Sequence, residues 1–202
     1  MKIYLIRHGE TNTNREKRYV GWTDVDLSTA GYQQAEKLSR LFAAENITAL
    51  YSSDLKRAEN TASFVGNSRG LRPITASQLR EIHFGEWEGL THAEIEENYG
   101  DKVKKWIEDP FGHLPPQGES LADVSRRAGS FLEEITANHE SGEAVVVVSH
   151  GGVIRVLLLS FFNLSMQQFW DITIDNASVS LLWKESNNYH VVYVNDTTHL
   201  QE

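Results

Sequence analysis

Two histidines in the sequence each come one residue after a short, mainly apolar run and directly before a glycine. His8 follows residues 2–6, and His150 follows a segment that contains the valine run 145–148. Such runs are typical of buried strands, and glycine interrupts the pattern. Because open α/β sheets bind ligands beyond the carboxyl ends of their strands, we expect both imidazoles in one crevice. Taken alone, His8 is equally compatible with a hydrogen-bonded structural histidine.

Two arginines accompany these histidines. Arg7 precedes His8, and Arg57 falls in the first turn of a helix that Ser53 can cap. The helix dipole disfavours a cation at that end, so Arg57 implies an anion nearby. Guanidinium groups bind phosphate oxygens in a bidentate manner, and the glycine turn at 151–152 offers backbone N–H groups. The pattern indicates a site for a phosphoryl group.

A divalent metal is the alternative, because the chain contains two such histidines and several carboxylates. The arginines argue against a metal, since they repel a cation and supply the charge that it would bring. They also lower the pKa of His8, which keeps its imidazole neutral and nucleophilic near pH 7. Glu81 lies in the acidic stretch 79–89, and bound phosphate would favour its protonated form, which suits it to protonate a leaving alkoxide.

The rest of the pattern predicts strands and helices that position these residues. Strands are expected at residues 2–6, 49–51, 73–76 and 143–149, with a hairpin at 177–183 and 189–194 around Asn187 and Asn188. A first helix is expected at residues 28–45, with Leu41 on its apolar face, and a second from Ser53 to Gly66. One or two short helices are expected within residues 91–110. Two more are expected, one from Ser120 to about Ile135 and one from residue 153 onward. Residues 12–26 lack a period and are expected to form a loop over the crevice. The sequence thus predicts one α/β domain with a mainly parallel sheet.

Composition limits the class of protein. The chain has 202 residues, enough for one α/β domain, and it has no cysteine for disulfides or thiolate metal sites. Its formal net charge of −9 argues against nucleic-acid binding, which needs a basic face. The apolar residues 153–162 are too few to span a bilayer, and Arg7 comes too early for a secretory signal. We expect a cytoplasmic protein that acts on a small molecule, with neither nucleic acid nor membrane as partner.

Four motifs resemble those of the histidine phosphatase, or phosphoglycerate mutase-like, superfamily. They are Arg7-His8-Gly9-Glu10-Thr11-x-x-Asn14, Ser53-x-Leu55-x-Arg57-Ala58, Leu79-x-Glu81-x-x-Phe84-Gly85-x-Trp87-Glu88-Gly89 and Ser149-His150-Gly151-Gly152. The resemblance runs from residue 2 to about residue 200, and four motifs in this order are far more specific than any one of them. It implies a three-layer α/β/α sandwich whose doubly wound, mostly parallel sheet has an antiparallel edge strand.

The resemblance also implies a mechanism without metal or cofactor. His8 would attack phosphorus in line and become phosphohistidine, while Glu81 protonates the leaving oxygen and later deprotonates water. The groups that would hold the phosphate oxygens are Arg7, Arg57 and His150, assisted by Asn14 and the Gly151 amide, with Gly21 and Glu10 as further binding or bracing candidates. Glu86 and Glu88 are close by in the sequence, and Glu81 is chosen as the general acid by its position within the motif.

The same resemblance favours a phosphatase over a mutase. Mutases of the family are longer, with an inserted segment after the general acid and asparagine where this chain has Gly152. Residues 115–120 and the tail 195–200 are similar to those of α-ribazole-5′-phosphate phosphatases and broad-specificity bacterial phosphatases, although Gln117 departs from the usual Pro-Gly-Gly-Glu-Ser pattern. The expected substrate is α-ribazole 5′-phosphate or a related small phosphomonoester. A phosphoglycerate mutase and a non-catalytic phospho-ligand-binding module remain alternatives.

We expect residues 1–202 to form a single domain in which residues 83–120 are an inserted segment that covers the substrate. Several aromatic residues either line a substrate cavity or belong to the core: Trp22, Phe84, Trp87, Tyr99 and Trp106. The hairpin near residue 180 would lie at a sheet edge, where pairing with a second copy would give a homodimer.

Overall fold

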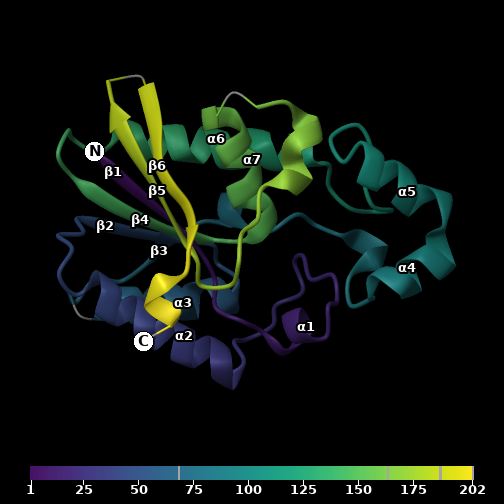
Figure 1. Ribbon diagram of the computed structural model, residues 1–202, viewed down its shortest axis with the longest axis horizontal. Coiled ribbons are helices and arrows are strands. Elements are labelled where there is room, and N and C mark those ends of the chain that lie inside the picture. Colours follow the sequence, from purple (N-terminus) through teal and green to yellow (C-terminus); the bar gives the residue numbers. More distant parts are fainter. Residues whose placement is uncertain (68, 163, 187, 202) are drawn as a thin grey trace.

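The computed structural model describes residues 1–67, 69–162, 164–186 and 188–201. A six-stranded sheet in the order β3-β2-β4-β1-β5-β6 forms its centre (Figure 1). The strands are β1 (Lys2–Arg7), β2 (Ala49–Ser52), β3 (Ile74–Thr75), β4 (Ala144–Ser149), β5 (Val179–Glu185) and β6 (Asn188–Asp196). Strands β1 to β4 are parallel to one another, whereas β5 is antiparallel to both β1 and β6.

The predicted sheet is confirmed, with differences in detail. The antiparallel strand β5 lies one place inside the edge, because β6 pairs along its outer side. β3 has only two residues, both exposed, in place of the four residues expected at 73–76. The predicted turn residue Asn187 lies outside the described residues.

Alternation along β1 shows how the sheet buries both of its faces. Ile3 and Leu5 belong to one core cluster, and Tyr4 and Ile6 belong to the other. β4 lies between β1 and β2 and is buried along its whole length, as its valine run predicts for a strand covered on both faces.

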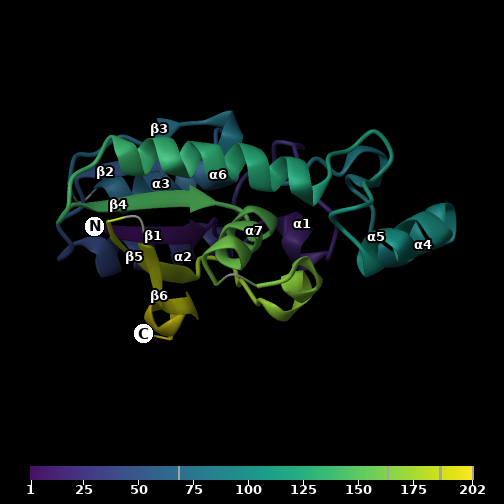
Figure 2. The same cartoon turned by 90° about the horizontal axis from the view of Figure 1, so that it is seen from above.

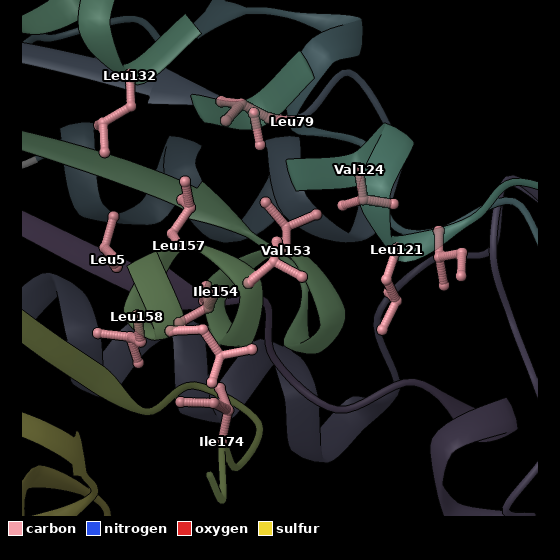
Figure 3. Close-up of a cluster of buried hydrophobic side chains, with 14 of the residues drawn as sticks. Leu5, Leu79, Leu121, Val124, Leu132, Val153, Ile154, Leu157, Leu158 and Ile174 are labelled. Carbon is pink, nitrogen blue, oxygen red and sulfur yellow. The ribbon is translucent and has the colours of Figure 1, made fainter. Parts of the chain in front are cut away.

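Helices cover both faces of the sheet. α2 (Thr29–Phe42) and α3 (Lys56–Asn67) pack on the face of Tyr4, whereas α6 (Leu121–Ala137) and α7 (Gly151–Phe162) pack on the face of Leu5. Figure 1 shows the two pairs on opposite sides of the sheet, and Figure 3 shows side chains of α6 and α7 in one buried cluster with Leu5. This is the predicted α/β/α sandwich.

Hydroxyl caps begin these helices close to where the sequence predicts. Ser28 accepts a hydrogen bond from Gly31 at the start of α2, and Ser120 forms a capping box at the start of α6. The cap expected from Ser53 differs, because its hydroxyl accepts from Leu55 in the turn before α3.

The apolar face of α2 is narrower than predicted. Leu41 is 43% exposed, because Ala35, Leu38 and Phe42 fill the contact with the sheet. The loop over the crevice also contains one helical turn, α1 (Asn12–Arg15), which Thr11 caps.

α4 (His92–Tyr99) and α5 (Asp101–Glu108) stand apart from the three layers. Figures 1 and 2 both show them beyond the end at which β1 and β4 finish. Their buried residues Ile95, Val103 and Trp106 join the core cluster that includes α6. No helix in the described part of the chain is long and apolar enough to cross a membrane.

Candidate active site

β1 and β4 deliver the two histidines to one place. Arg7 lies opposite Ser149 in this parallel pair, so His8 and His150 leave the sheet side by side. Their ring centroids are 5.1 Å apart, and the ring planes are inclined by 60°. The two side chains are buried, at 3% and 0% exposure. The structure therefore brings together the histidines whose meeting the strand pattern predicts.

A backbone carbonyl orients the ring of His8. Its Nδ1 lies 2.7 Å from the carbonyl oxygen of Gly9, and because a carbonyl can only accept, Nδ1 carries the proton. Nε2 of the neutral ring therefore keeps its lone pair. Burial lowers the pKa of His8 well below its ordinary value, and the charges of Arg57 and Arg7 lower it further. The ring is thus neutral, with one nitrogen free to act as a nucleophile.

Two glycines let the loop after β1 reach this position. A Cβ on Gly9 would overlap the carbonyl of Gly31, and a Cβ on Gly31 would overlap the carbonyl of Glu10. The backbone N–H of Gly9 donates to Thr61 at 3.0 Å, and the Thr61 hydroxyl donates to the carbonyl of Arg57 at 2.7 Å. The loop that carries His8 is thereby tied to the helix that carries Arg57.

Two guanidinium groups approach the histidines from different elements. Arg57 on α3 is 1% exposed and donates to the carbonyls of Gly21 at 2.7 Å and Thr23 at 3.1 Å. Arg7 donates to the carbonyl of Ile174 at 2.7 Å. Burial lowers the pKa of Arg57 to about 10, so the group remains a cation at neutral pH. In the described part of the chain neither guanidinium forms an ion pair, although the charge of Glu81 acts on both, so both cations are available to an anion.

His150 is buried without a hydrogen-bond partner for either ring nitrogen among the described residues. Burial lowers its pKa well below the ordinary value, and Arg57 and His8 add to the effect. Buried polar groups are nearly always hydrogen-bonded, and an unpaired one costs free energy. A ligand bound between the two histidines would supply the missing partner.

Glu81 reaches the same place from the segment after β3. Its Oε2 accepts a hydrogen bond from the backbone N–H of Gly152 at 3.1 Å, and its Oε1 accepts one from that of Ile82 at 3.0 Å. A Cβ at position 152 would overlap Oε1 of Glu81. Glycine at this position therefore lets the carboxylate lie against the first turn of α7.

An ion pair that the sequence did not reveal holds the backbone around Glu81. Arg127 on α6 donates to both carboxylate oxygens of Glu119, at 2.7 and 2.8 Å. The same guanidinium donates to the carbonyls of Glu81 at 3.0 Å and Gln78 at 2.6 Å. The backbone N–H of Glu119 donates in turn to the carbonyl of His83 at 2.9 Å. The pair therefore fixes the chain on both sides of the Glu81 side chain.

Asn14 and Asn176 connect the crevice loop to the chain before β5. Asn14 lines the cavity that contains His8, and its Oδ1 accepts a hydrogen bond from Asn176 at 3.1 Å. Asn176 also donates to the backbone carbonyl of His8 at 3.2 Å. Sequence reasoning predicted Asn14 but missed Asn176, which no motif marked.

The other predicted residues take distinct positions. The carbonyl of Gly21 accepts from Arg57, and a Cβ there would overlap the carbonyl of Ile82. Gly151 begins α7, and a Cβ there would come within 3.5 Å of the Arg7 guanidinium. The carboxylate of Glu10 accepts hydrogen bonds from two side chains, Arg15 at 2.7 Å and Ser28 at 2.8 Å. These hydrogen bonds connect the loop after β1 to the start of α2 and to α1.

Two adjoining cavities open onto these groups. The first, of about 390 Å³, contains His8 and Arg57, and the second, of about 230 Å³, contains Arg155. Residues that line both are Arg7, Tyr19, Glu81 and Phe84. Further aromatic side chains around the second are Trp106, Phe169 and Trp170, whereas Trp87 is core and Trp22 lies over the Arg80 guanidinium. No group of three or more possible metal-ligating side chains occurs in residues 1–67, 69–162, 164–186 and 188–201.

Protein stability should fall as the pH drops below about 6.5, the ordinary histidine pKa. The unfolded chain protonates His8 and His150 there, whereas burial and the arginines keep both neutral in the fold. The unfolded state then binds more protons, so this contribution is complete above pH 6.5 and decreases towards the lowered folded pKa values. Between pH 7 and pH 5.5 we expect a loss of roughly 1 kcal/mol per histidine in urea denaturation without phosphate.

The control for this prediction is His190→Gln, at an exposed position of β6, which should leave the pH dependence unchanged. His150→Gln should remove about half of it. An identical pH dependence in the wild type and His150→Gln would mean that His150 is not held neutral.

Comparison with protein families gives a match over nearly the whole chain. Residues 3–197 match the model of the histidine phosphatase superfamily (branch 1). Phosphoserine phosphatase 1 of Hydrogenobacter thermophilus is 35% identical over 202 residues, which is 100% of this chain and 95% of that protein. The 2,3-bisphosphoglycerate-dependent phosphoglycerate mutase 2 of Gloeobacter violaceus is 33% identical and covers 86% and 81%. The adenosylcobalamin/alpha-ribazole phosphatase of Escherichia coli is 28% identical and covers 90% and 89%.

Solved structures agree with these matches. YhfR of Bacillus stearothermophilus superimposes with a TM-score of 0.93 at 34% identity and covers 98% of both chains. A mycobacterial glucosyl-3-phosphoglycerate phosphatase superimposes with a TM-score of 0.89 at 30% identity and covers 97% of this chain and 99% of that one.

Proposed function

The chain belongs to the histidine phosphatase superfamily (branch 1), and we propose that it hydrolyses small phosphomonoesters without a metal ion, through a phosphohistidine at His8. It is a phosphoric monoester hydrolase, as the four motifs predict. The single observation that carries the proposed mechanism is the orientation of His8. With Nδ1 donating to Gly9, Nε2 is the nitrogen left to form a bond to phosphorus in the cavity that Arg7 and Arg57 line.

Positive charge around His8 supports phosphoryl transfer. The transition state spreads charge over three equatorial oxygens, and fixed donors stabilise it most where water is excluded. Arg7 and Arg57 serve as these donors, and His150 donates through a ring nitrogen that has no partner in the described part of the chain. Asn14 and the backbone N–H of Gly151 assist, and Gly21 acts through its hydrogen bond to Arg57.

Glu81 acts as general acid and then as general base. It lines both cavities beside Arg7, so it can protonate the leaving oxygen and afterwards deprotonate the attacking water. Its neighbours are less suited. Glu86 accepts a hydrogen bond from Gln117 at 2.7 Å. Burial raises the pKa of Glu88, but hydrogen bonds from Thr23 and Trp22 outweigh it and lower that pKa, which keeps Glu88 ionised.

The second cavity supports a small leaving group. Its volume of about 230 Å³ equals that of roughly eight water molecules at about 30 Å³ each. A serine or glycerate leaving group fits within this volume, so small alkyl esters join α-ribazole 5′-phosphate, the substrate expected from the sequence, as candidates. Residues 83–120 contribute Phe84 and Trp106 to the cavity wall, in keeping with a segment that covers the substrate within a single domain.

Position 152 supports hydrolysis over mutase activity. The asparagine of the family's mutases would here place a Cβ against the Glu81 carboxylate. The similarity to a phosphoglycerate mutase nevertheless makes mutase activity the second candidate. The cytoplasmic location and the homodimer expected from the sequence stay predictions.

A substrate panel tests the proposed function. Purified protein should release phosphate from p-nitrophenyl phosphate and from small alkyl phosphates, at equal rates with and without EDTA. With 3-phosphoglycerate, free phosphate should exceed 2-phosphoglycerate. Dominant formation of 2-phosphoglycerate would establish a mutase, loss of activity to EDTA with recovery on Mg²⁺ a metal hydrolase, and no turnover of any ester a binding module.

We predict that Arg127→Met lowers kcat/KM for alkyl phosphates by about 10- to 100-fold, because a catalytic group displaced by about 1 Å loses activity on this scale. The change frees the backbone at Glu81 without touching the reacting atoms. The kcat/KM for p-nitrophenyl phosphate should fall much less, since its leaving group departs without a proton. The matched control is Arg126→Met, whose exposed side chain pairs with Asp123. Equal losses for both esters would indicate a general structural role for Arg127.

A further inference from the structure

Arg155 is a fixed guanidinium in the wall of the second cavity. It lies on α7, one turn after Gly151 and Gly152. Its Nε donates to the carbonyl of Ile172 at 2.7 Å, and its guanidinium carbon lies 5.4 Å from the ring centroid of Phe169. A hydrogen bond at one edge and an aromatic ring at one face hold the group in one orientation.

The charge of Arg155 is not neutralised by an ion pair with any described residue. Its contacts in the described chain are the hydrogen bond through Nε and the aromatic ring at its flat face, so the outer nitrogens have no hydrogen-bond partner there, and the side chain lines the second cavity. Burial lowers the pKa of Arg155, while Glu81 and Asp175 counteract this from a distance. A partly desolvated cation with an unpaired fork favours an oxyanion, which guanidinium binds through two parallel hydrogen bonds.

Arg155 lies outside the cavity proposed to hold the phosphate. The first cavity contains His8 and Arg57, whereas Arg155 lines only the second. Arg7 and Glu81 line both and thus mark the boundary. In the proposed reaction Glu81 protonates the oxygen that leaves phosphorus, so the second cavity receives what that oxygen carries. Arg155 therefore faces the leaving group.

We propose that Arg155 binds a carboxylate of the leaving group, which makes phosphorylated small hydroxy acids the preferred substrate class. This inference rests on the proposed function. A carboxylate fits better than a second phosphate, because the first cavity offers two guanidinium groups, Arg7 and Arg57, together with His8, whereas the second cavity offers Arg155 with Arg7 only at its boundary. Aromatic side chains in the wall lower the local polarity, which strengthens a single charge-assisted contact.

Matched substrates test the proposal. 3-Phosphoglycerate and glycerol 3-phosphate differ in the carboxylate, as do O-phosphoserine and O-phosphoethanolamine. Since an unmatched buried charge is costly, we expect wild-type kcat/KM to be about 30-fold or more higher for the carboxylated member of each pair. Free glycerate should also inhibit hydrolysis of p-nitrophenyl phosphate at concentrations at which glycerol does not.

Arg155→Met should reduce this preference to about 5-fold or less, chiefly through KM of the carboxylated ester, and Arg155→Lys should keep an intermediate preference. Arg40→Met is the matched control, because Arg40 is exposed on α2 and pairs only within that helix. Its preference should equal that of the wild type. The product-inhibition measurement uses unmodified protein and does not depend on the folding of any variant.

The outcomes separate this inference from the function on which it rests. If the wild type hydrolyses all four esters through a phosphohistidine but shows no preference for the carboxylated ones, the role of Arg155 is wrong and the proposed function stands. If it hydrolyses none of them and no p-nitrophenyl phosphate, the proposed function itself fails. Equal losses for carboxylated and neutral esters in Arg155→Lys would overturn the subsite and leave Arg155 as a support of α7.

Discussion

Replacing His8 with alanine is expected to lower kcat for phosphomonoesters by at least about 10⁴-fold, as removal of a nucleophile does in other enzymes that form covalent intermediates. The remaining groups still bind phosphate, so KM should change far less than kcat. Brief incubation of the wild type with a ³²P-labelled ester, followed by denaturation, should leave label on the protein that is labile in acid and stable in base. The His8→Ala variant should carry none.

Two variants make this result specific. His190→Ala, at an exposed position on β6, should keep full labelling and turnover. His150→Ala should still accept label but more slowly, because His150 stabilises charge and does not bond to phosphorus in the proposed mechanism. Label on His8→Ala, or an acid-stable phosphoester in the wild type, would contradict the role of His8.

The meeting of the two histidines was predictable because it follows from local patterns and one topological rule. Each apolar run identifies a strand, each glycine marks its end, and parallel neighbours end at the same edge of a sheet. The register of Arg7 opposite Ser149 then leaves His8 and His150 adjacent. Strand assignment and this rule are enough to expect both histidines at one edge of the sheet, and the pairing of β1 with β4 makes them neighbours.

Other parts of the site depend on contacts that no local pattern encodes. Arg127 reaches the Glu81 carbonyl across 46 positions of the chain, and Asn176 reaches the His8 carbonyl across 168. Such partners are determined when helices and loops pack, after each element has its own structure. One weak signal existed for Arg127, since it adjoins Ala128 on the buried stripe of α6 and a charge there requires a partner.

Arg155 carries a similar signal in the sequence. An arginine within the apolar run 153–159 argues against a membrane span, and the same isolation predicts a functional or paired charge. In the structure the helix around it is almost entirely buried, with Val153, Ile154, Val156 and Leu157 in the core. A charged side chain in such a helix implies a function, and Arg155 can bind a ligand in the second cavity.

Changing Glu81 to glutamine should affect the two steps of the reaction differently, because the first step needs a proton for the leaving group and the second needs a base for the attacking water. The amide in Glu81→Gln keeps the size of the side chain but cannot protonate a leaving group, so kcat/KM for alkyl phosphates should fall by about 10²- to 10⁴-fold. For p-nitrophenyl phosphate kcat/KM should fall much less, because nitrophenolate is stable as an anion. Hydrolysis of phosphohistidine still needs a base, so kcat for this ester should fall and labelled phosphohistidine should accumulate.

Glu86→Gln is the matched control, because this carboxylate is exposed and bonds to Gln117 on the surface. It should leave rates on both ester types within about twofold of the wild type, as surface substitutions do. A burst of nitrophenolate followed by slow turnover in Glu81→Gln would identify dephosphorylation as the step that lost its base. If alkyl and aryl esters instead lose activity equally and no phosphoenzyme accumulates, Glu81 does not transfer the proton, and the general acid must be sought among the other groups that line the two cavities.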